Sequence, residues 1–486
     1  MEYLDFIIRI ESRRGEVFAV GIQSPAGEGS SELRLPFPPD QFAAQISALG
    51  RAMRGTREVV VEPGAPAAPP PSDLGNVLFQ SLFTGACRDL FNTSIGQVQG
   101  RGVGLRIKLH IDPTEPDIAD LASLPWELMY RSETRDYLSL SRGTPLVRYL
   151  DVQRPFTLLP YTPPLRILIV VSSPAGVPPL DLADERRAIE ASWGHAQGVE
   201  VDFLSQATSL RLCDRLAATP YHVLHFMGHG DFDAANGTGV LLLEDEAGMA
   251  APMDGATLGM LLRDAPSMRL VFLNACNTAQ ASRRAGLDPF AGVANALVMA
   301  GVPAVVAMQF PISDSAAIEF ASTFYPRLVE GFPIDAAVAE ARKAIRMADG
   351  TSWEWATPVL FMRSRDGALF APPAASQPTT SATTGAALPA SQLADRVQAM
   401  QTLSSTFAPE RYTILGLIVV SVLVFLLGGW KLFQVNAAAA TSQATLLSVT
   451  GGAGSAALFL VSRLLKINER TVALLRELSL PSGGAH

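Results

Sequence analysis

Two apolar runs, each ending in small and polar residues, decide the fold predicted for this chain. Residues 221–230 read YHVLHFMGHG and residues 270–279 read LVFLNACNTA. Short runs of this kind are typical of buried strands in a parallel sheet, and open α/β sheets place their chemistry at the carboxyl ends of such strands. The first run delivers His229 and the second Cys276. A thiol paired with an imidazole indicates an activated cysteine nucleophile.

Both segments resemble the CHAT family of caspase-like peptidases, which belongs to clan CD with caspases, gingipains and separase. In that family a His-Gly pair follows one strand, and a Leu-Asn-Ala-Cys-x-Thr segment follows the next. This chain has GHG at 228–230 and LNACNT at 273–278. The separation, 276 − 229 = 47, is close to the roughly 50 residues of the caspase signature. The resemblance extends from about Leu165 to Arg363 and implies a caspase-like, mainly parallel sheet with helices on both faces.

The resemblance also implies roles for the residues of the site. Cys276 is the expected nucleophile, and His229 is the expected general base and acid. The backbone N–H groups of Gly230 and Cys276 are expected to hold the oxyanion of the tetrahedral intermediate. For an isolated Cys and His, a buried structural thiol and a turn histidine would be the simpler interpretation. The two flanking motifs favour catalysis.

Two acidic residues are candidates for the pocket that receives the side chain before the cut bond. Asp231 follows Gly230, and Asp314 follows an apolar strand-like run. An acidic pocket would favour Arg or Lys in the substrate. For each residue taken alone, a solvated loop carboxylate is the simpler interpretation.

A metal site is the alternative raised by His225, four residues before His229. We expect Gly228 to end the strand, so that the two imidazoles do not share a face. The sequence also has no acidic or Cys ligand at a spacing that would complete a zinc site. We therefore expect no metal and no cofactor, and we interpret His222 and His225 as residues of the core that support the site.

Composition predicts further regions around the peptidase domain, which we place at 158–364 because strands alternate there with helices. Residues 1–157 are expected to form an α+β accessory domain, with a degenerate caspase-like half as one interpretation. Residues 365–410 are rich in Ala, Ser, Thr and Pro and indicate a flexible linker. Residues 411–486 are interpreted as a membrane region that ends in an amphipathic cytoplasmic tail.

The membrane prediction depends on two uncharged stretches near the C-terminus. Tyr412 to Trp430 contains 19 residues without a charge, enough for the roughly 20 that a membrane-spanning helix needs. A second, weaker stretch follows, and we expect a hairpin of helices near 412–433 and 443–462. Basic residues flank the outer ends of the hairpin. The positive-inside tendency then places the peptidase domain in the cytoplasm, at the inner membrane.

Charge and cysteine content limit the partners. A net charge of −8 gives no reason to expect nucleic acid, and three cysteines form no disulfide framework, which favours a reducing compartment. The expected partners are a protein substrate near the membrane, the membrane itself and a second copy of the chain.

Two functional hypotheses remain open. The first is a membrane-anchored cysteine endopeptidase that cleaves a partner or itself; the resemblance implies a bacterial stress or defence effector that triggers cell death. The alternative is a signalling scaffold or sensor whose C-terminal hairpin oligomerises and perturbs the membrane. A non-peptidase α/β hydrolase is disfavoured, because no Gly-x-Ser-x-Gly elbow lies near a strand end.

Overall fold

The computed structural model describes residues 1–35, 70–112, 115–152, 158–160, 163–177, 187, 198–233, 238–277, 289–310 and 312–371. The predicted membrane helices near 412–433 and 443–462, and most of the predicted linker, lie outside these residues. Among the residues described, none of the helices combines the length and the apolar character that crossing a membrane requires.

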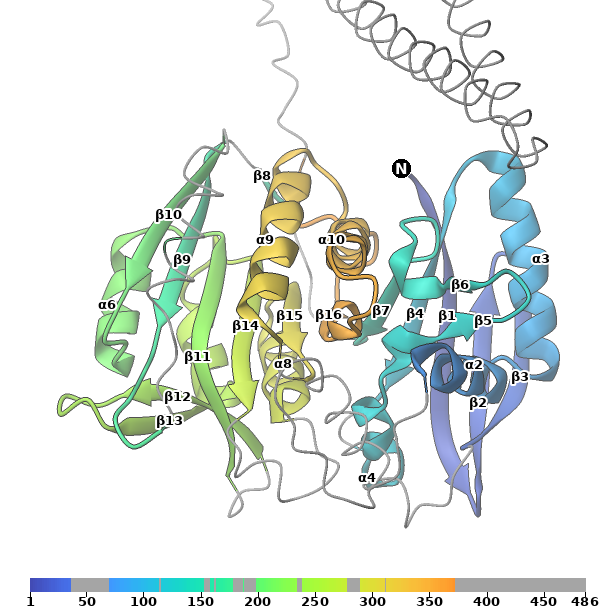
Figure 1. The fold of residues 1–486 in the computed structure, drawn as a ribbon, viewed down its shortest axis with the longest axis horizontal. Helices are drawn as coiled ribbons and strands as arrows, with labels where there is room; N and C mark the ends of the chain where they lie inside the picture. The colour runs from blue at the N-terminus through green and yellow to red at the C-terminus, as the bar shows by residue number, and fades with distance from the viewer. Residues whose placement is uncertain are drawn as a thin grey trace, which may run out of the picture. The chain divides into compact units, whose positions relative to one another are not determined.

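One mixed sheet, mainly parallel, runs through the described chain (Figure 1). From edge to edge its strands are β10 (Val199–Leu204), β9 (Leu165–Val171), β11 (Val223–Asp233), β14 (Leu270–Asn277), β15 (Ala304–Met308), β16 (Pro358–Met362), β7 (Leu146–Tyr149), β4 (Gly104–Ile111), β1 (Tyr3–Arg14), β2 (Val17–Ser24) and β3 (Gly27–Arg34). The antiparallel pairs in this order are β15–β16, β1–β2 and β2–β3. Two further strands, β12 (Thr238–Glu244) and β13 (Ala250–Asp254), extend from β11 as an antiparallel pair. The predicted α/β class with a mainly parallel sheet is confirmed.

Helices cover both faces of the sheet in residues 158–364, as predicted. On one face α6 (Ser209–Ala218), α7 (Gly255–Arg263) and α8 (Pro289–Ala300) pack on a buried apolar cluster. On the other face α9 (Asp314–Val329) and α10 (Ile334–Ala348) pack on a second cluster, which continues under α2 (Pro71–Leu82) and α3 (Gly85–Arg101). Shorter elements are β5 (Tyr130–Arg131), β6 (Asp136–Tyr137), β8 (Leu159–Pro160), β17 (Phe370–Ala371), α4 (Pro116–Ala119), and the 3-10 turns η1 (Asp120–Ser123), η2 (Trp126–Leu128), η3 (Leu138–Leu140) and η5 (Glu354–Ala356).

The sheet continues across the domain boundary predicted near residue 157. β7 pairs in parallel with β16, where Arg148 lies opposite Phe361 and Tyr149 opposite Met362. Only two residue pairs make this junction. Buried side chains also connect the parts of the chain before and after residue 157. Arg106 on β4 donates from Nε to Oδ2 of Asp335 on α10 at 2.5 Å, and both side chains are almost fully buried.

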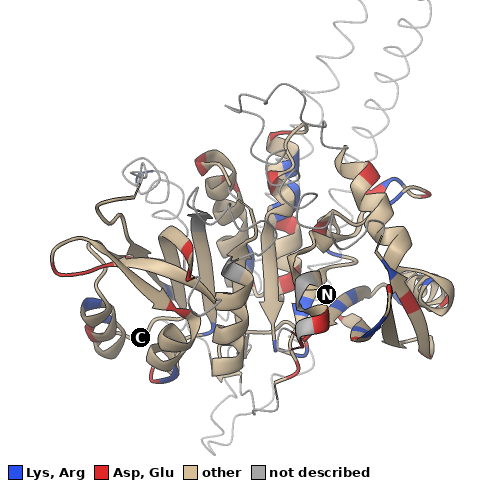
Figure 2. Cartoon of the chain, turned by 90° about the horizontal axis from the view of Figure 1, so that it is seen from below, with Lys and Arg blue, Asp and Glu red and all other residues tan. Residues whose placement is uncertain are grey.

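Charged side chains are interspersed over the helices and loops. In the view of Figure 2, Lys and Arg alternate with Asp and Glu across the described part of the chain.

Candidate functional site

The two strands that carry the predicted catalytic pair are immediate neighbours. β11 and β14 pair in parallel, and the register places His229 opposite Cys276 and Gly230 opposite Asn277. Register partners on adjacent strands lie about 4.8 Å apart. The sheet therefore brings together two positions that are 47 residues apart in the sequence, and both positions belong to the same face.

The prediction that Gly228 ends the strand is wrong. β11 continues to Asp233, because β12 pairs with residues 229–233 in antiparallel fashion and takes over as a neighbour beyond the end of β9. Gly228 is needed for close packing and not for a turn. A Cβ at this position would lie 2.7 Å from Cζ of Phe226 and 3.0 Å from the carbonyl oxygen of Ser172.

His229 lies on the face of the sheet that α9 covers. Alternate residues of β11, Val223 and Met227, belong to the apolar cluster under α9, whereas Leu224 and Phe226 belong to the cluster under α6, α7 and α8. The alternation of a strand puts His229 with the first set. Its side chain is only 3% exposed, so the imidazole lies in a largely water-free environment.

His225 and His229 share a face, contrary to the prediction, because the strand does not stop between them. Nδ1 of His225 lies 3.0 Å from the hydroxyl of Tyr325 on α9, and its ring lies 4.4 Å from that of Phe272. Burial lowers the pKa of His225 to about 3, so this imidazole is neutral at physiological pH. Within the described ranges, no group of three or more His, Cys, Asp or Glu side chains could hold a metal ion.

His222 lies at the opposite end of β11 from His229. Its Nδ1 accepts a hydrogen bond from the backbone N–H of Arg166 at 3.0 Å. Burial, with the nearby charges of Arg166 and Arg269, lowers the pKa of His222. The bond joins the beginnings of β9 and β11, and the role is structural.

Element lengths put the amino end of α9 near the level of His229 and Cys276. Phe272 on β14 contacts Phe320 and Phe324, with ring centroids 5.6 and 6.1 Å apart. Cys276 is four residues further along the strand, a rise of about 13 Å, which corresponds to roughly nine residues of helix. α9 follows β15 and runs back along the sheet (Figure 1). Nine residues counted back along the helix from Phe320 and Phe324 therefore reach its first turn, near Asp314.

The candidate pocket residues each have a local structural role. Oδ1 of Asp231 accepts a hydrogen bond from the backbone N–H of Phe232 at 2.8 Å. Asp314 is exposed in the first turn of α9, where a carboxylate stabilises the helix dipole. Ser313 caps the same helix, since its Oγ accepts from the N–H of Ala316 at 3.3 Å. A role in substrate binding stays a prediction for both acidic residues.

Sequence patterns did not identify Tyr325 as a residue near the candidate site. An aromatic residue at helical spacing indicates core, and the packing of its ring beside Phe324 fits that interpretation. Its bond to His225 spans 100 residues of sequence. No local pattern around either residue could have indicated it.

Comparison with known proteins identifies the family of the chain. Residues 84–366, more than half of the 486, match the model of the CHAT domain. Among solved structures, the chain is similar to chains of the Saccharomyces cerevisiae separase-securin complex at 3.0 and 2.6 Å resolution, with identities of 11% and 10% and TM-scores of 0.43 and 0.39. Each of these matches covers 74% of this chain and 30% of the other. Comparison with curated protein sequences gives no match. By the match to the CHAT model, the chain belongs to the CHAT-domain family.

Proposed function

We propose that this chain is a cysteine endopeptidase with Cys276 as the nucleophile and His229 as the general base and acid. The observation that carries the proposal is the register of β11 and β14, which sets His229 opposite Cys276. In the proposed reaction His229 takes the thiol proton as sulfur attacks the scissile carbonyl carbon. It then gives the proton to the leaving amine, and water hydrolyses the thioester.

The surroundings favour an activated thiol. A thiol with an ordinary pKa near 8.5 is largely protonated at neutral pH, and a neighbouring imidazole or a helix amino end lowers that pKa. His229 supplies the imidazole, and the first turn of α9 lies at the level of the pair. In contrast, burial without such partners raises the pKa of the Cys87 thiol to about 12.

The oxyanion is proposed to bind the backbone N–H groups of Gly230 and Cys276. Leu270 donates its N–H to the carbonyl of His222 at 3.2 Å, so even-numbered residues of β11 turn their backbone groups toward β14. The amide of Gly230 belongs to this set. For the proposed role it must be released from the ladder when substrate binds, and its loss would cost about 10²–10³ in rate.

The setting of the reaction is also part of the proposal. Residues 411–486 would anchor the chain in the inner membrane with the peptidase domain in the cytoplasm, as the uncharged stretch at 412–430 favours. Tethering would raise the effective concentration of a membrane-proximal substrate, of the linker at 365–410 or of a second copy. A role as a bacterial stress or defence effector rests on the resemblance of the motifs.

The test compares protein termini in cells that express the wild-type chain, Cys276→Ala, His229→Ala or Cys213→Ala. Cys213 is an exposed thiol on α6, and it is the matched control. New amino termini are expected with the wild type and Cys213→Ala and not with the two site variants. Termini that are the same in all four would contradict the peptidase. A cellular effect retained by Cys276→Ala would favour the scaffold whose hairpin perturbs the membrane.

A further inference from the structure

The N-terminal region, the part of the chain before residue 158, reaches the edge of the sheet that carries the proposed nucleophile. Nε2 of Gln309 donates a hydrogen bond to the carbonyl oxygen of Ser123 at 2.7 Å, across 186 residues of sequence. Gln309 directly follows the last residue of β15, and Ser123 is the last residue of η1. β15 pairs in parallel with β14, where Ala307 lies opposite Leu273. Gln309 therefore lies at the same edge of the sheet as Cys276, three residues beyond Leu273 on β14.

The amide of Gln309 is buried, and its hydrogen bonding is incomplete. The side chain is 7% exposed, and its Oε1 has no hydrogen-bond partner in the part of the chain that the structure describes. An unsatisfied buried acceptor costs at least as much free energy as one hydrogen bond of this kind typically contributes. The amide therefore adds little to stability, and its bond to Ser123 points to a role in placing the two residues.

Arg148 holds the η1–η2 segment, residues 120–128, in one shape. Its guanidinium donates to both carboxylate oxygens of Glu127, at 3.1 and 2.6 Å. It also donates to the carbonyl oxygens of Ala122 and Leu124, at 3.3 and 2.9 Å. The side chains of Arg148 and Glu127 are both buried. These bonds fix the carbonyl groups immediately before and after the one that accepts from the end of β15.

A second contact joins the same segment to the strand beside β15. Arg342 on α10 donates from Nε and Nη2 to the carbonyl oxygen of Pro358, at 3.1 and 2.6 Å. Nη2 of Arg342 also lies 3.9 Å from Oε1 of Glu127. Pro358 begins β16 and lies opposite Met308, the last residue of β15. The η1–η2 segment is therefore linked to both strands at this edge.

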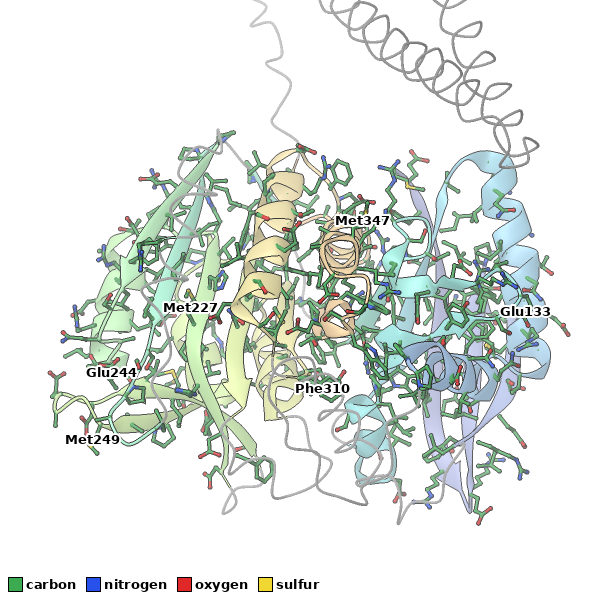
Figure 3. The ribbon with its side chains drawn as sticks, in the orientation of Figure 1. Glu133, Met227, Glu244, Met249, Phe310 and Met347 are labelled. Atoms are coloured by element: carbon green, nitrogen blue, oxygen red, sulfur yellow. The ribbon has the colours of Figure 1, made fainter. Side chains whose placement is uncertain are left out.

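Glu354 holds the other end of the connection between β15 and α9. Its Oε1 accepts from the backbone N–H of Ser313 at 2.5 Å, and its Oε2 accepts from the hydroxyl of Ser313 at 3.0 Å. Ser313 is the amino cap of α9. Figure 3 labels Phe310, the second residue of this connection, close to α4, which leads into η1. The connection is thus fixed at both ends, and at its first end by the N-terminal region.

We propose that Gln309 is a positioning residue for the proposed catalytic pair. Through its bond to Ser123, the η1–η2 segment sets the end of β15 beside Cys276. This inference rests on the proposed function, in which Cys276 is the nucleophile. In open α/β sheets the site is formed at the carboxyl ends of the strands, the edge at which Gln309 lies. The N-terminal region is then a working part of the peptidase, and a displacement of the η1–η2 segment changes the reactivity of Cys276.

The test measures the rate at which iodoacetamide alkylates Cys276 in the full chain between pH 5 and 9, followed by peptide mass spectrometry. This readout needs no peptide substrate. Cys213 is exposed and Cys87 is buried, so the same sample contains a reactive and an unreactive reference thiol. Alkylation of Cys87 would report a general loss of structure.

The variants separate the proposed contact from a general loss of stability. Gln309→Met keeps the length of the side chain without the amide, and Glu127→Gln removes the charge that binds Arg148. A double variant combines the two changes. Thr144→Val is the matched control, because it removes a buried bond of the same kind, from Oγ1 of Thr144 to the carbonyl oxygen of Leu138 at 3.0 Å, within the N-terminal region.

Gln309→Met is expected to move the alkylation profile of Cys276 about one unit toward higher pH, which slows the reaction at pH 6.5 by about tenfold. Without the amide the end of β15 loses its link to the η1–η2 segment, and the neighbouring end of β14 is held less closely against His229. Glu127→Gln is expected to shift the profile in the same direction, by less. Because both changes act through one bond, the double variant should match Gln309→Met and not the sum of the two shifts. Thr144→Val is expected to lower the melting temperature and to leave the profile unchanged.

His229→Ala separates the inference from the function on which it rests. If this variant changes the profile and Gln309→Met matches the wild type, the role of Gln309 is overturned and the catalytic pair stands. If His229→Ala also leaves the profile unchanged, the proposed pair itself falls, and the inference falls with it. Additive shifts in the double variant, or an equal shift in Thr144→Val, would overturn the route through the η1–η2 segment. Should Gln309→Met fail to fold, as judged by its thermal melt, Glu127→Gln compared with Thr144→Val still decides the question.

Discussion

Nδ1 of His225 and the hydroxyl of Tyr325 lie 3.0 Å apart, which ties the strand that carries His229 to helix α9. Both side chains are buried in the apolar layer between β11 and α9. The bond therefore joins a polar pair whose members are 100 residues apart in the chain. One consequence is a dependence of stability on pH.

Stability is expected to fall as the pH decreases below about 6.5, the pKa of an unfolded-state histidine. Burial lowers the pKa of His225 to about 3 in the folded chain, so between these values the unfolded state binds a proton that the folded state does not. Above the pKa of the unfolded-state histidine, His225 contributes nothing to the pH dependence of stability. His225→Gln is expected to reduce the slope of unfolding free energy against pH by up to about 1.4 kcal/mol per pH unit in this range. Urea unfolding from pH 7.5 to 4.5 measures it, and equal slopes in wild type and variant would contradict the assignment.

The sequence was sufficient to predict the main features of the fold and the adjacency of the strands that carry His229 and Cys276. The apolar runs that begin at 221 and 270 form β11 and β14, which pair in parallel. Strands buried on both faces read as continuous apolar runs without alternation. The extension of β11 through Gly228 was not predictable. A glycine at this position is compatible with a turn, and the actual reason for it lies in Phe226 and Ser172, the second of which is far away in the sequence. Nor did the sequence indicate the junction of β7 with β16 or the role of Tyr325, since both depend on long-range packing.

Gly228→Ala is expected to destabilise the chain by about 1–3 kcal/mol, the usual cost of adding a methyl group to a filled site. The added Cβ would lie 2.7 Å from Phe226, inside the strand that carries His229. The matched control is Gly96→Ala in α3, where a Cβ meets no atom within 4 Å and helix propensity favours alanine by about 1 kcal/mol. Urea unfolding of both variants should give shifts of opposite sign. A neutral Gly228→Ala would show that the strand relaxes at this point.

Asp335→Ala is expected to cost about 3–5 kcal/mol, because it removes the buried carboxylate that Arg106 contacts at 2.5 Å and leaves only that of Asp5, which is 3.4 Å away and one-third exposed. The side chains of Arg106 and Asp335 are 2% and 0% exposed and join β4 to α10. Glu340→Ala is the control on the same helix, since Glu340 pairs with Lys343 at a partly exposed site, where the two side chains are 20% and 39% exposed and ion pairs contribute about 0–1 kcal/mol. Thermal melts would compare the two variants. Equal small losses would mean that the carboxylate of Asp5 and the carbonyls of Arg365 and Asp366, which also accept from Arg106, are enough to satisfy its charge.

A chain that ends at Gln377 is expected to fold with the same melting temperature as the full chain. Residues Met1–Gln377 form one compact unit, and the apolar clusters under α9 and under α6 to α8 lie within it. The membrane proposal adds a second expectation. In a flotation assay with phospholipid vesicles, the full chain should rise with the lipid and the shortened chain should stay behind. If the shortened chain also floats, the anchor would have to lie in the first 377 residues, and the stretch at 412–430 would lose its proposed role. If neither floats, the proposed membrane anchor is wrong, and so is the proposed rise in the effective concentration of a membrane-proximal substrate.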